Sequence, residues 1–405
     1  MVEDTDIVVV GAGMVGLAAA AALAHAERRR WRVCLVDAGE PLAPVATAIQ
    51  TLRVSALSPS SLGLLAGVGA LEAMEPMAQP YRDMRVWDAS GHPFEPGAVH
   101  FSASDAAHPT LGSVVENDRV RAALLNELAA CGVDVHFNKR LDKLRLERRY
   151  QRLNFADGTV LKSRLVVAAD GSNSVTRRLL GIECARKNYA QSALVCHVTS
   201  ELAHEATAWQ QFNPGGPLAL LPLADGRISI VCSNTPQRVS ELCNGSDATL
   251  GDSLTELSNA ALGRLQPDSP RASFSLGAAQ ATRYNGARTV LIGDAAHRVH
   301  PLAGQGANLG FADVIELVKQ LGASSDSDDP GEARALQRYA RHRRREARQT
   351  IVALDGLQRL FDGESAALRQ FRVRGMRWFD SLPLAKRAAM FAAMGVDAGT
   401  AIAAR

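Results

Sequence analysis

The sequence has few of the residues that build metal centres or disulfide frameworks. Its six cysteines stand apart, without a C-x-x-C pair and without histidines at zinc-ligand spacing. They are Cys34, Cys131, Cys184, Cys196, Cys232 and Cys243. We therefore expect free thiols in a reducing compartment, and no metal site.

The sequence also lacks a large excess of either charge and has few long apolar runs. The 45 basic and 42 acidic residues leave a net charge of +3, which gives no electrostatic reason to expect a nucleic-acid partner. One uncharged run, residues 7–24, imitates a membrane span, but glycines interrupt it where a strand-turn-helix needs them. No cationic leader precedes this run, so we expect a cytoplasmic protein, with a peripheral position at the inner membrane face as an alternative.

The first motif that carries chemistry is the run Gly11-Ala12-Gly13-Met14-Val15-Gly16, between a predicted strand and an Ala-rich helix. These glycines permit a tight turn and close approach of a pyrophosphate to a helix N-terminus. Asp37 ends the next predicted strand, where an acid can hold a ribose hydroxyl. The pattern predicts a dinucleotide site, and the alternative is a purely structural glycine turn.

A second motif, Asp170-Gly171-Ser172-Asn173-Ser174-Val175-Thr176-Arg177, follows an apolar strand. An Asp or Ser cap at an ordinary strand-to-helix turn explains it equally well.

The third motif joins Gly293-Asp294-Ala295-Ala296-His297 to the run from His300 to Gly310. A strand delivers Asp294 to a loop, where its carboxylate can accept hydrogen bonds from a polyol chain. The helix N-terminus near Gly304–Gly306 can face a ring that becomes anionic on reduction. So long a glycine-rich loop indicates function more than structure.

In this order, the three motifs resemble the group A FAD-dependent aromatic monooxygenases of the para-hydroxybenzoate hydroxylase type. The segments 53–58, 114–117 and 300–310 look most like the ubiquinone-biosynthesis hydroxylases. Motifs and resemblance together predict these FAD-contacting residues: Gly11, Gly13, Met14, Val15, Gly16, Asp37, Arg53, Asn117, Asp170, Gly171, Arg177, Gly293, Asp294, Pro301, Gly304, Gln305, Gly306, Ala307 and Asn308.

The resemblance implies a hydroxylase in which NAD(P)H reduces FAD and O₂ then forms a flavin hydroperoxide that attacks an electron-rich ring. A second G-x-G-x-x-G is absent, which fits transient NAD(P)H binding. The only candidates for a catalytic group beside the flavin are His297, His300 and Pro301. The implied substrate is a small aromatic molecule, a polyprenylated phenol precursor of ubiquinone.

Other functions remain open at this stage. They are hydroxylation of another aromatic metabolite, flavin-dependent prenyl-chain reduction, and a non-enzymatic role as an escort for lipidated proteins. A flavin halogenase is disfavoured because its W-x-W-x-I-P signature is absent.

The predicted fold class is α/β (α+β overall), a Rossmann-like FAD-binding domain with an inserted mixed β-sheet substrate domain and a C-terminal helical region. The FAD-binding domain is expected at 1–80, 113–183 and 285–345, substrate-domain segments at 81–112 and 184–284, and the helical region at 346–405. One helix is expected near Leu250–Arg264 within the insert.

An apolar channel for the prenyl tail is expected around Leu218–Leu223, since each buried CH₂ contributes roughly 0.8 kcal/mol. Homo-oligomerisation, a complex of ubiquinone-biosynthesis proteins and lipid docking are open alternatives for partners. Docking would use the basic run Arg341–Arg348 or the helices of 371–394, with Met376, Trp378, Phe379, Met390 and Phe391. Ordinary helix packing is the competing interpretation.

Overall fold

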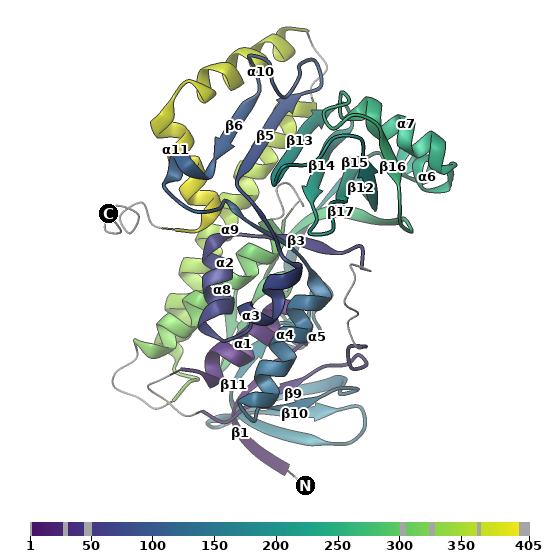
Figure 1. Ribbon diagram of the computed structural model, residues 1–405. Coiled ribbons are helices and arrows are strands. Elements are labelled where there is room, and N and C mark those ends of the chain that lie inside the picture. Colours follow the sequence, from purple (N-terminus) through teal and green to yellow (C-terminus); the bar gives the residue numbers. More distant parts are fainter. Residues whose placement is uncertain are drawn as a thin grey trace.

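Two large β-sheets with their helices form the two lobes of the molecule (Figure 1). The computed structural model describes residues 2–26, 31–43, 51–299, 305–323, 329–362 and 366–396. The lower lobe in Figure 1 surrounds β1, β11 and α1, and the upper lobe contains β12 to β17 together with β5 and β6. Segments far apart in the sequence therefore share each lobe.

The lower sheet has eight strands within the described residues, in the order β18-β19-β11-β1-β2-β8, and β10 and β9 extend it from β11. Strand β1 pairs in parallel with both β2 and β11. The four side chains of Ile7–Val10 are buried, as expected for a parallel strand covered on both faces. The strands are β1 (Val2–Val10), β2 (Val33–Val36), β8 (Asp134–His136), β9 (Leu141–Glu147), β10 (Tyr150–Phe155), β11 (Val160–Ala168), β18 (Asn285–Gly286) and β19 (Thr289–Leu291).

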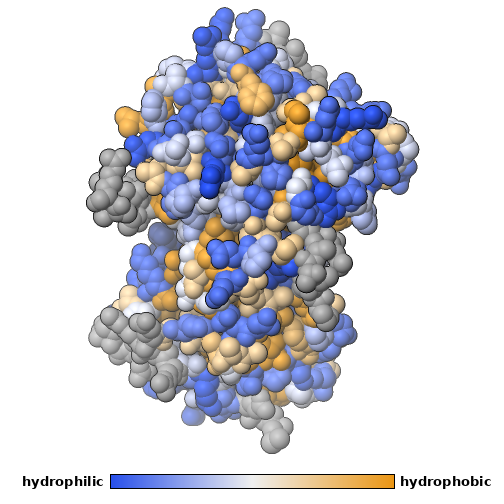
Figure 2. All heavy atoms as spheres, in the orientation of Figure 1, coloured by the Kyte–Doolittle hydropathy of each residue, from blue (hydrophilic) through white to orange (hydrophobic). Residues whose placement is uncertain are grey.

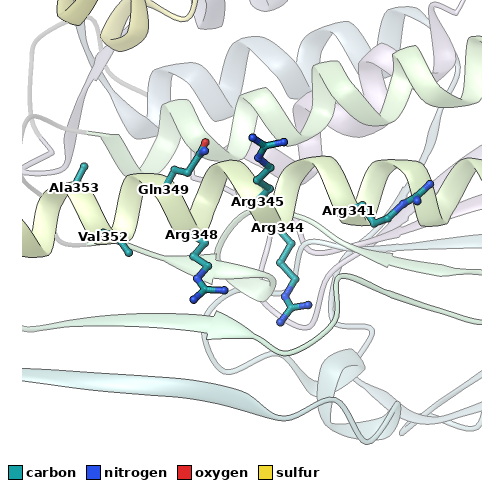
Figure 3. Close-up of a pocket in the computed structure, with 7 residues that line it drawn as sticks. All are labelled: Arg341, Arg344, Arg345, Arg348, Gln349, Val352 and Ala353. Carbon is teal, nitrogen blue, oxygen red and sulfur yellow. The ribbon is translucent and has the colours of Figure 1, made fainter.

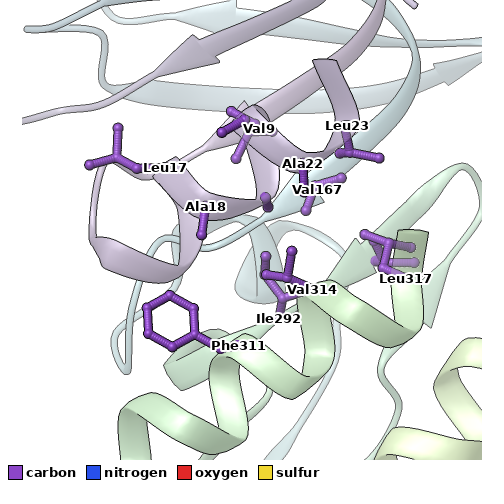
Figure 4. Close-up of a cluster of buried hydrophobic side chains, with 14 of the residues drawn as sticks. Val9, Leu17, Ala18, Ala22, Leu23, Val167, Ile292, Phe311, Val314 and Leu317 are labelled. Carbon is purple, nitrogen blue, oxygen red and sulfur yellow. The ribbon is translucent and has the colours of Figure 1, made fainter. Parts of the chain in front are cut away.

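Helix α1 (Met14–Ala24) is buried almost all round, between the lower sheet and helices α4 (Asn117–Ala130) and α8 (Gln305–Gly322). Its alanines leave room for the neighbouring helices to approach. Figure 4 shows Leu17 and Ala18 of α1 near Phe311 and Val314 of α8, in a cluster that includes Ile292. This packing holds the N-terminus of α1 beside the loop that follows β19.

The upper sheet has nine strands within the described ranges, in the order β20-β17-β12-β15-β14-β13-β5-β6, with β16 paired to β12. Residues 83–102 supply β5 and β6, so this early segment joins the sheet built mainly by residues 184–281. The strands are β5 (Asp83–Asp88), β6 (Val99–Ser102), β12 (Cys184–Ser200), β13 (Thr207–Asn213), β14 (Gly216–Pro222), β15 (Ile228–Asn234), β16 (Leu265–Pro267), β17 (Ala272–Ala281) and β20 (His297–Arg298).

The helix expected near 250–264 is present as α7 (Asp247–Leu257), and a further helix that was not expected, α6 (Pro236–Asn244), precedes it. Each has its own N-cap, because the Thr235 and Ser246 side chains accept hydrogen bonds from the Arg238 and Thr249 amides. After α7 the chain turns through Asn259 with positive φ, so the expected extension is wrong.

The leucines expected to line a channel are divided between the two faces of β14. Leu218 and Leu220 are fully buried and pack with Trp87 in the core on the α6 and α7 side of the sheet. Leu221 and Leu223 pack on the opposite side with Ala56. Only the second pair is therefore on the side where a channel to the lower lobe can lie.

The remaining elements pack on the two lobes or run between them. A small sheet has the order β3-β7-β4, and helix α9 runs along both lobes (Figure 1). These elements are β3 (Val54–Leu57), β4 (Gln79–Tyr81), β7 (Gly112–Glu116), α2 (Pro59–Gly67), α3 (Leu71–Met74), α5 (Val175–Leu179), α9 (Ala333–Asp362), α10 (Ala366–Asp380), α11 (Pro383–Met394) and the short 3₁₀ turns Glu75–Met77, Ala103–Ala106 and Gly293–Ala295.

Candidate cofactor-binding and active site

The three fingerprint glycines have different physical roles. Gly11 has φ +114°, and a Cβ there would lie 2.3 Å from the Ala169 carbonyl oxygen. A Cβ on Gly16 would lie 2.0 Å from the Gly11 oxygen. A Cβ on Gly13 would meet no atom within 4 Å. Gly11 and Gly16 are therefore required by the turn itself, whereas Gly13 keeps its outer side clear, as close approach of a pyrophosphate requires.

Asp37 lies directly after β2, and its carboxylate hydrogen-bonds the glycine turn of residues 11–16. Its Oδ2 accepts a hydrogen bond from the Ala12 amide at 2.5 Å, and its Oδ1 accepts one from the Gly39 amide at 2.7 Å. Next in the fingerprint, Met14 and Val15 form the first turn of α1, whose amides are free of helix partners. The Val15 side chain packs against Gly293, which joins the first motif to the third.

Arg53 and Asn117 lie next to each other although 64 positions separate them. Strands β3 and β7 pair in antiparallel fashion, and the Asn117 amide donates to the Arg53 carbonyl oxygen at 2.9 Å. The Ser55 hydroxyl donates to Asn117 Oδ1 at 2.7 Å. The Arg53 side chain is exposed, and its guanidinium carbon lies 5.6 Å from the centre of the Phe274 ring. Arg53 thus reaches the space between the lobes.

The second motif makes mainly internal contacts. The Asp170 carboxylate accepts hydrogen bonds from the Ser174 hydroxyl and from the Thr176 amide, and so caps α5. Arg177 is 3% exposed and donates to the Ala295 carbonyl oxygen at 2.7 Å. Gly171 has φ +77°, a conformation that favours glycine. The motif therefore ties the end of β11 to the Gly293 loop.

Asp294 is the exposed member of an otherwise buried turn. Gly293, Ala295 and Ala296 are buried beside it, and no group in the described ranges hydrogen-bonds its carboxylate. Burial by the surrounding protein raises the pKa of Asp294, and the charges of His297 and Arg298 oppose this shift. A carboxylate that solvent reaches inside a recess suits the hydroxyls of a polyol chain.

Replacing Asp294 with alanine should weaken FAD retention about tenfold, because one charge-assisted hydrogen bond contributes roughly 1.5–3 kcal/mol. The melting temperature of the apoprotein should hardly change, since the carboxylate is exposed. Flavin absorbance per protein after dialysis measures the effect. Asp252→Ala, at an exposed position on α7, is the control. Full flavin content in the Asp294 variant would contradict this role.

The loop between β20 and α8 is only partly described. His300, Pro301 and Gly304 lie outside the described residues, while Gln305, Gly306 and Ala307 open α8. Both ends of the Asn308 side chain have protein partners. Its Oδ1 accepts from the Ser58 amide and its Nδ2 donates to the Ala56 carbonyl oxygen, each at 2.9 Å. The Asn308 side chain thus links α8 to β3, and a contact with FAD would involve its backbone.

His297 belongs to a buried ionic cluster. It is 2% exposed, and its Nε2 lies 2.6 Å from Asp313 Oδ2. Asp313 also accepts hydrogen bonds from the Gly293 amide at 2.8 Å and from Arg343 Nε at 2.6 Å. Burial raises the pKa of Asp313, but His297 and Arg343 more than offset it, so the pKa lies below the ordinary value. This geometry favours a positioning role for His297 over proton transfer.

Asp313, just beyond the third motif, is an important residue to which the sequence assigned no role. It lies on the buried face of α8 with Gly310, Val314 and Leu317. An acid at a position where helical spacing predicts an apolar residue was the available signal. Gly310 has a related role, because a Cβ there would lie 2.5 Å from a Val15 methyl group.

Together these residues fit FAD. The fingerprint leaves room at Gly13, Asp37 ends β2, and Asp294 presents a free carboxylate on the loop that packs against Val15. In the part of the chain that the structure describes, no group of three or more His, Cys, Asp or Glu residues could hold a metal ion.

Comparisons with known proteins identify the family of the chain. The model of a family described as FAD binding domain matches residues 4–353. The 3-demethoxyubiquinol 3-hydroxylase of Escherichia coli (strain K12) is 34% identical over 97% of this chain and 99% of its own length. The mitochondrial ubiquinone biosynthesis monooxygenase COQ6 of Danio rerio is 33% identical, over 96% of this chain and 89% of the relative.

Solved structures share the fold at lower identity. The p-nitrophenol 4-monooxygenase PnpA of Pseudomonas putida DLL-E4 has a TM-score of 0.78 at 18% identity, covering 97% of this chain and 99% of that one. Klebsiella pneumoniae HpxO, solved with FAD and uric acid, has a TM-score of 0.74 at 20% identity, covering 96% of this chain and 97% of that one. The chain is therefore an FAD-, NAD(P)H- and O₂-dependent flavoprotein monooxygenase and belongs to the family that includes the ubiquinone-biosynthesis hydroxylases.

Proposed function

We propose that this enzyme hydroxylates the aromatic ring of a polyprenylated phenol precursor of ubiquinone. The observation that carries the proposal is the near full-length match to a hydroxylase of a ubiquinol precursor, combined with a site that fits FAD. The prenyl-chain reductase and the escort protein are not favoured, because the relatives are monooxygenases and hydroxylases.

Bound FAD supplies the redox chemistry, because it takes a hydride from NAD(P)H and activates O₂. The protein binds the cofactor and the substrate and shields the reacting atoms from water. The first turn of α1 would bind the pyrophosphate at Gly13, and Asp294 would accept hydrogen bonds from the ribityl hydroxyls. Leu221 and Leu223 face the small sheet and offer apolar surface to a prenyl tail. Enclosure between the two lobes would limit the access of water to the reacting oxygen.

The test uses the purified yellow protein with 2-(3-methylbut-2-enyl)phenol as the short-chain probe. We expect consumption of NAD(P)H and O₂ in equal amounts and a product heavier by one oxygen atom in mass spectrometry. NAD(P)H oxidation without O₂ uptake would support a reductase instead. A colourless protein that binds no FAD would overturn the proposal. The lipid extract of a deletion strain should accumulate a ubiquinone precursor that lacks one hydroxyl group.

We further propose that helix α9 docks on an anionic bilayer where the substrate resides. The residues Arg341, Arg344, Arg345 and Arg348 are exposed at helical spacing, and within the described ranges none has a carboxylate partner. With Gln349, Val352 and Ala353 they line a hollow of about 570 Å³ (Figure 3), in which Arg344 and Arg348 project side by side. The opposite face of α9 is buried through Tyr339 and Ala347.

The C-terminal helices offer less for lipid docking than their composition indicates. Met390 and Phe391 are buried against Leu111, and the Phe379 ring lies edge to face with Phe101. Three large apolar side chains of these helices are nevertheless exposed, Phe371 at 66%, Trp378 at 67% and Leu384 at 83%. Figure 2 shows blue, hydrophilic side chains over much of the visible face, with orange ones interspersed. No helix among the described residues combines the length and apolarity that crossing a bilayer requires.

Reversing all four α9 arginines to glutamate should lower binding to phosphatidylglycerol vesicles at least about 100-fold, since each basic residue near such a surface contributes about 1 kcal/mol. Co-sedimentation at low and high salt measures it. The matched control reverses Arg145, Arg148 and Arg149, which are exposed on the β9–β10 hairpin. Equal loss in both variants, or unchanged binding in the first, would contradict docking through α9.

A further inference from the structure

Strand β13 carries two adjacent glutamines that point to opposite faces of the upper sheet. Trp209 lies in the core on the α6 and α7 side, and Gln211 Nε2 donates to Asn259 Oδ1 at 2.9 Å on that same side. Because successive side chains of a strand alternate between faces, Gln210 points to the other face with Phe212.

The Gln210 face of the sheet is the one turned toward the cofactor motifs. Phe212 packs with Val299 and with Leu309 of α8, on either side of the loop that follows β20. Farther across the same face, Phe274 lies beneath the Arg53 guanidinium. Val299 lies next to the predicted FAD-binding segments and Arg53 belongs to one of them, so this face of the sheet is turned toward the predicted FAD site.

The Gln210 side chain is largely buried there, and its amide has no hydrogen-bond partner among the described residues. The residue is 5% exposed, and no group in the described part of the chain donates to its Oε1 or accepts from its Nε2. Gln211 on the opposite face donates to Asn259, and its Oε1 is fully enclosed without a partner. The amide atoms of Gln210, by contrast, are not fully enclosed, so water or a ligand can reach them and satisfy them.

The neighbours of Gln210 on this face are apolar and only half-buried. Val86 and Ala219 lie opposite it on the two adjacent strands, Val231 lies opposite Ala219, and Leu221 follows on β14. Their counterparts on the other face, such as Leu220 and Ile230, are fully buried. Apolar surface that stays accessible around one free amide matches a flat ring with one polar substituent.

We propose that Gln210 binds the ring hydroxyl of the substrate. The inference rests on the proposed function, because it assumes that the substrate ring lies between the sheet and FAD. The hydroxyl donates to Gln210 Oε1 while the ring packs on Ala219 and Val231.

The test compares two probes, 2-(3-methylbut-2-enyl)phenol and (3-methylbut-2-enyl)benzene, which lacks the hydroxyl. Each is titrated into the FAD-loaded enzyme, and the flavin absorbance change gives Kd. We expect the wild type to bind the phenol about tenfold more tightly, as one hydrogen bond allows. Gln210→Leu should bind both probes within about twofold of each other and keep full FAD content. Gln211→Leu, on the opposite face, should keep the wild-type ratio.

The possible results distinguish failure of the Gln210 role from failure of the proposed hydroxylase function. A Gln210→Leu enzyme that keeps the tenfold preference overturns the role of Gln210, even if the wild type hydroxylates the phenol. A wild type that binds both probes equally also overturns it. A wild type that neither binds nor oxidises the phenol removes the proposed function and this inference with it. If Gln210→Leu lowers kcat and leaves the phenol preference intact, the residue is structural only.

Discussion

Gly13→Val should abolish FAD binding and leave the fold intact. A Cβ at position 13 meets no protein atom within 4 Å, so the valine side chain fits the folded protein. It would occupy the outer side of the turn, where the pyrophosphate must approach the first amides of α1. Loss of that approach should weaken FAD at least about 100-fold, or roughly 2.7 kcal/mol. Flavin titration of the apoprotein measures this affinity, and circular dichroism checks the fold.

The neighbouring glycines supply the contrast. Alanine at Gly11 or Gly16 would place a Cβ within 2.3 Å or 2.0 Å of a backbone oxygen, so these variants should be recovered poorly folded. A Gly13→Val protein with normal FAD affinity would contradict the assignment of the fingerprint. A Gly13→Val protein that fails to fold would show that the turn, and not the ligand, requires this glycine.

Asp313→Ala should destabilise the protein by about 3–5 kcal/mol at neutral pH, because removing one partner of a buried ion pair leaves an uncompensated charge. Arg343 is 3% exposed and donates to Asp313, and His297 would lose its partner as well. The Gly293 amide would also lose its acceptor, so FAD retention should fall with stability. Urea unfolding of both apoproteins gives the difference.

The pH dependence of this effect has a defined sign. His297 and Arg343 hold the pKa of Asp313 below the ordinary 3.8 despite burial, so its stabilising contribution is complete above that value. The contribution is lost as the pH falls through the lower pKa of the folded state. The difference between wild type and variant should therefore shrink below about pH 3.8. Asp225→Ala, which removes an ion pair with Arg227 at the surface, should cost less than about 1 kcal/mol. Equal costs would refute the buried cluster.

The cofactor motifs could be predicted from the sequence because each lies within one short, continuous run of residues. Gly11 to Gly16 and the segment from Gly293 to His297 follow strands and carry the residues that tight turns and polyol contacts need. Membership of the flavoprotein monooxygenases, the mixed α/β fold and the cofactors were predicted in this way and are confirmed. The helix expected near 250–264 is present but spans Asp247–Leu257, and the preceding α6 was missed because its capping residue, Thr235, was overlooked.

Residue roles were harder to predict than motifs. Arg177 was expected to contact the cofactor. In the structure, its guanidinium donates hydrogen bonds to the carbonyl oxygens of Ala295 and Ser172. The Asn308 side-chain amide likewise hydrogen-bonds the backbone, accepting from the Ser58 amide and donating to the Ala56 carbonyl oxygen. A sequence pattern shows that a polar residue follows a strand or opens a helix. It does not show whether protein or ligand groups will satisfy that residue.

By itself, the sequence determined the dinucleotide turn, the order of strands and helices and, through its motifs, the family, because these depend on neighbours within about twenty residues. Only the tertiary structure decided which side chains meet across long separations. It joined His297, Asp313 and Arg343 in one buried cluster and brought Arg53 over Phe274. It also placed Gln210 on the face of β13 that carries Phe212 and Gln211 on the α6 and α7 side, since strand register and sheet packing, not composition, set which face a side chain occupies.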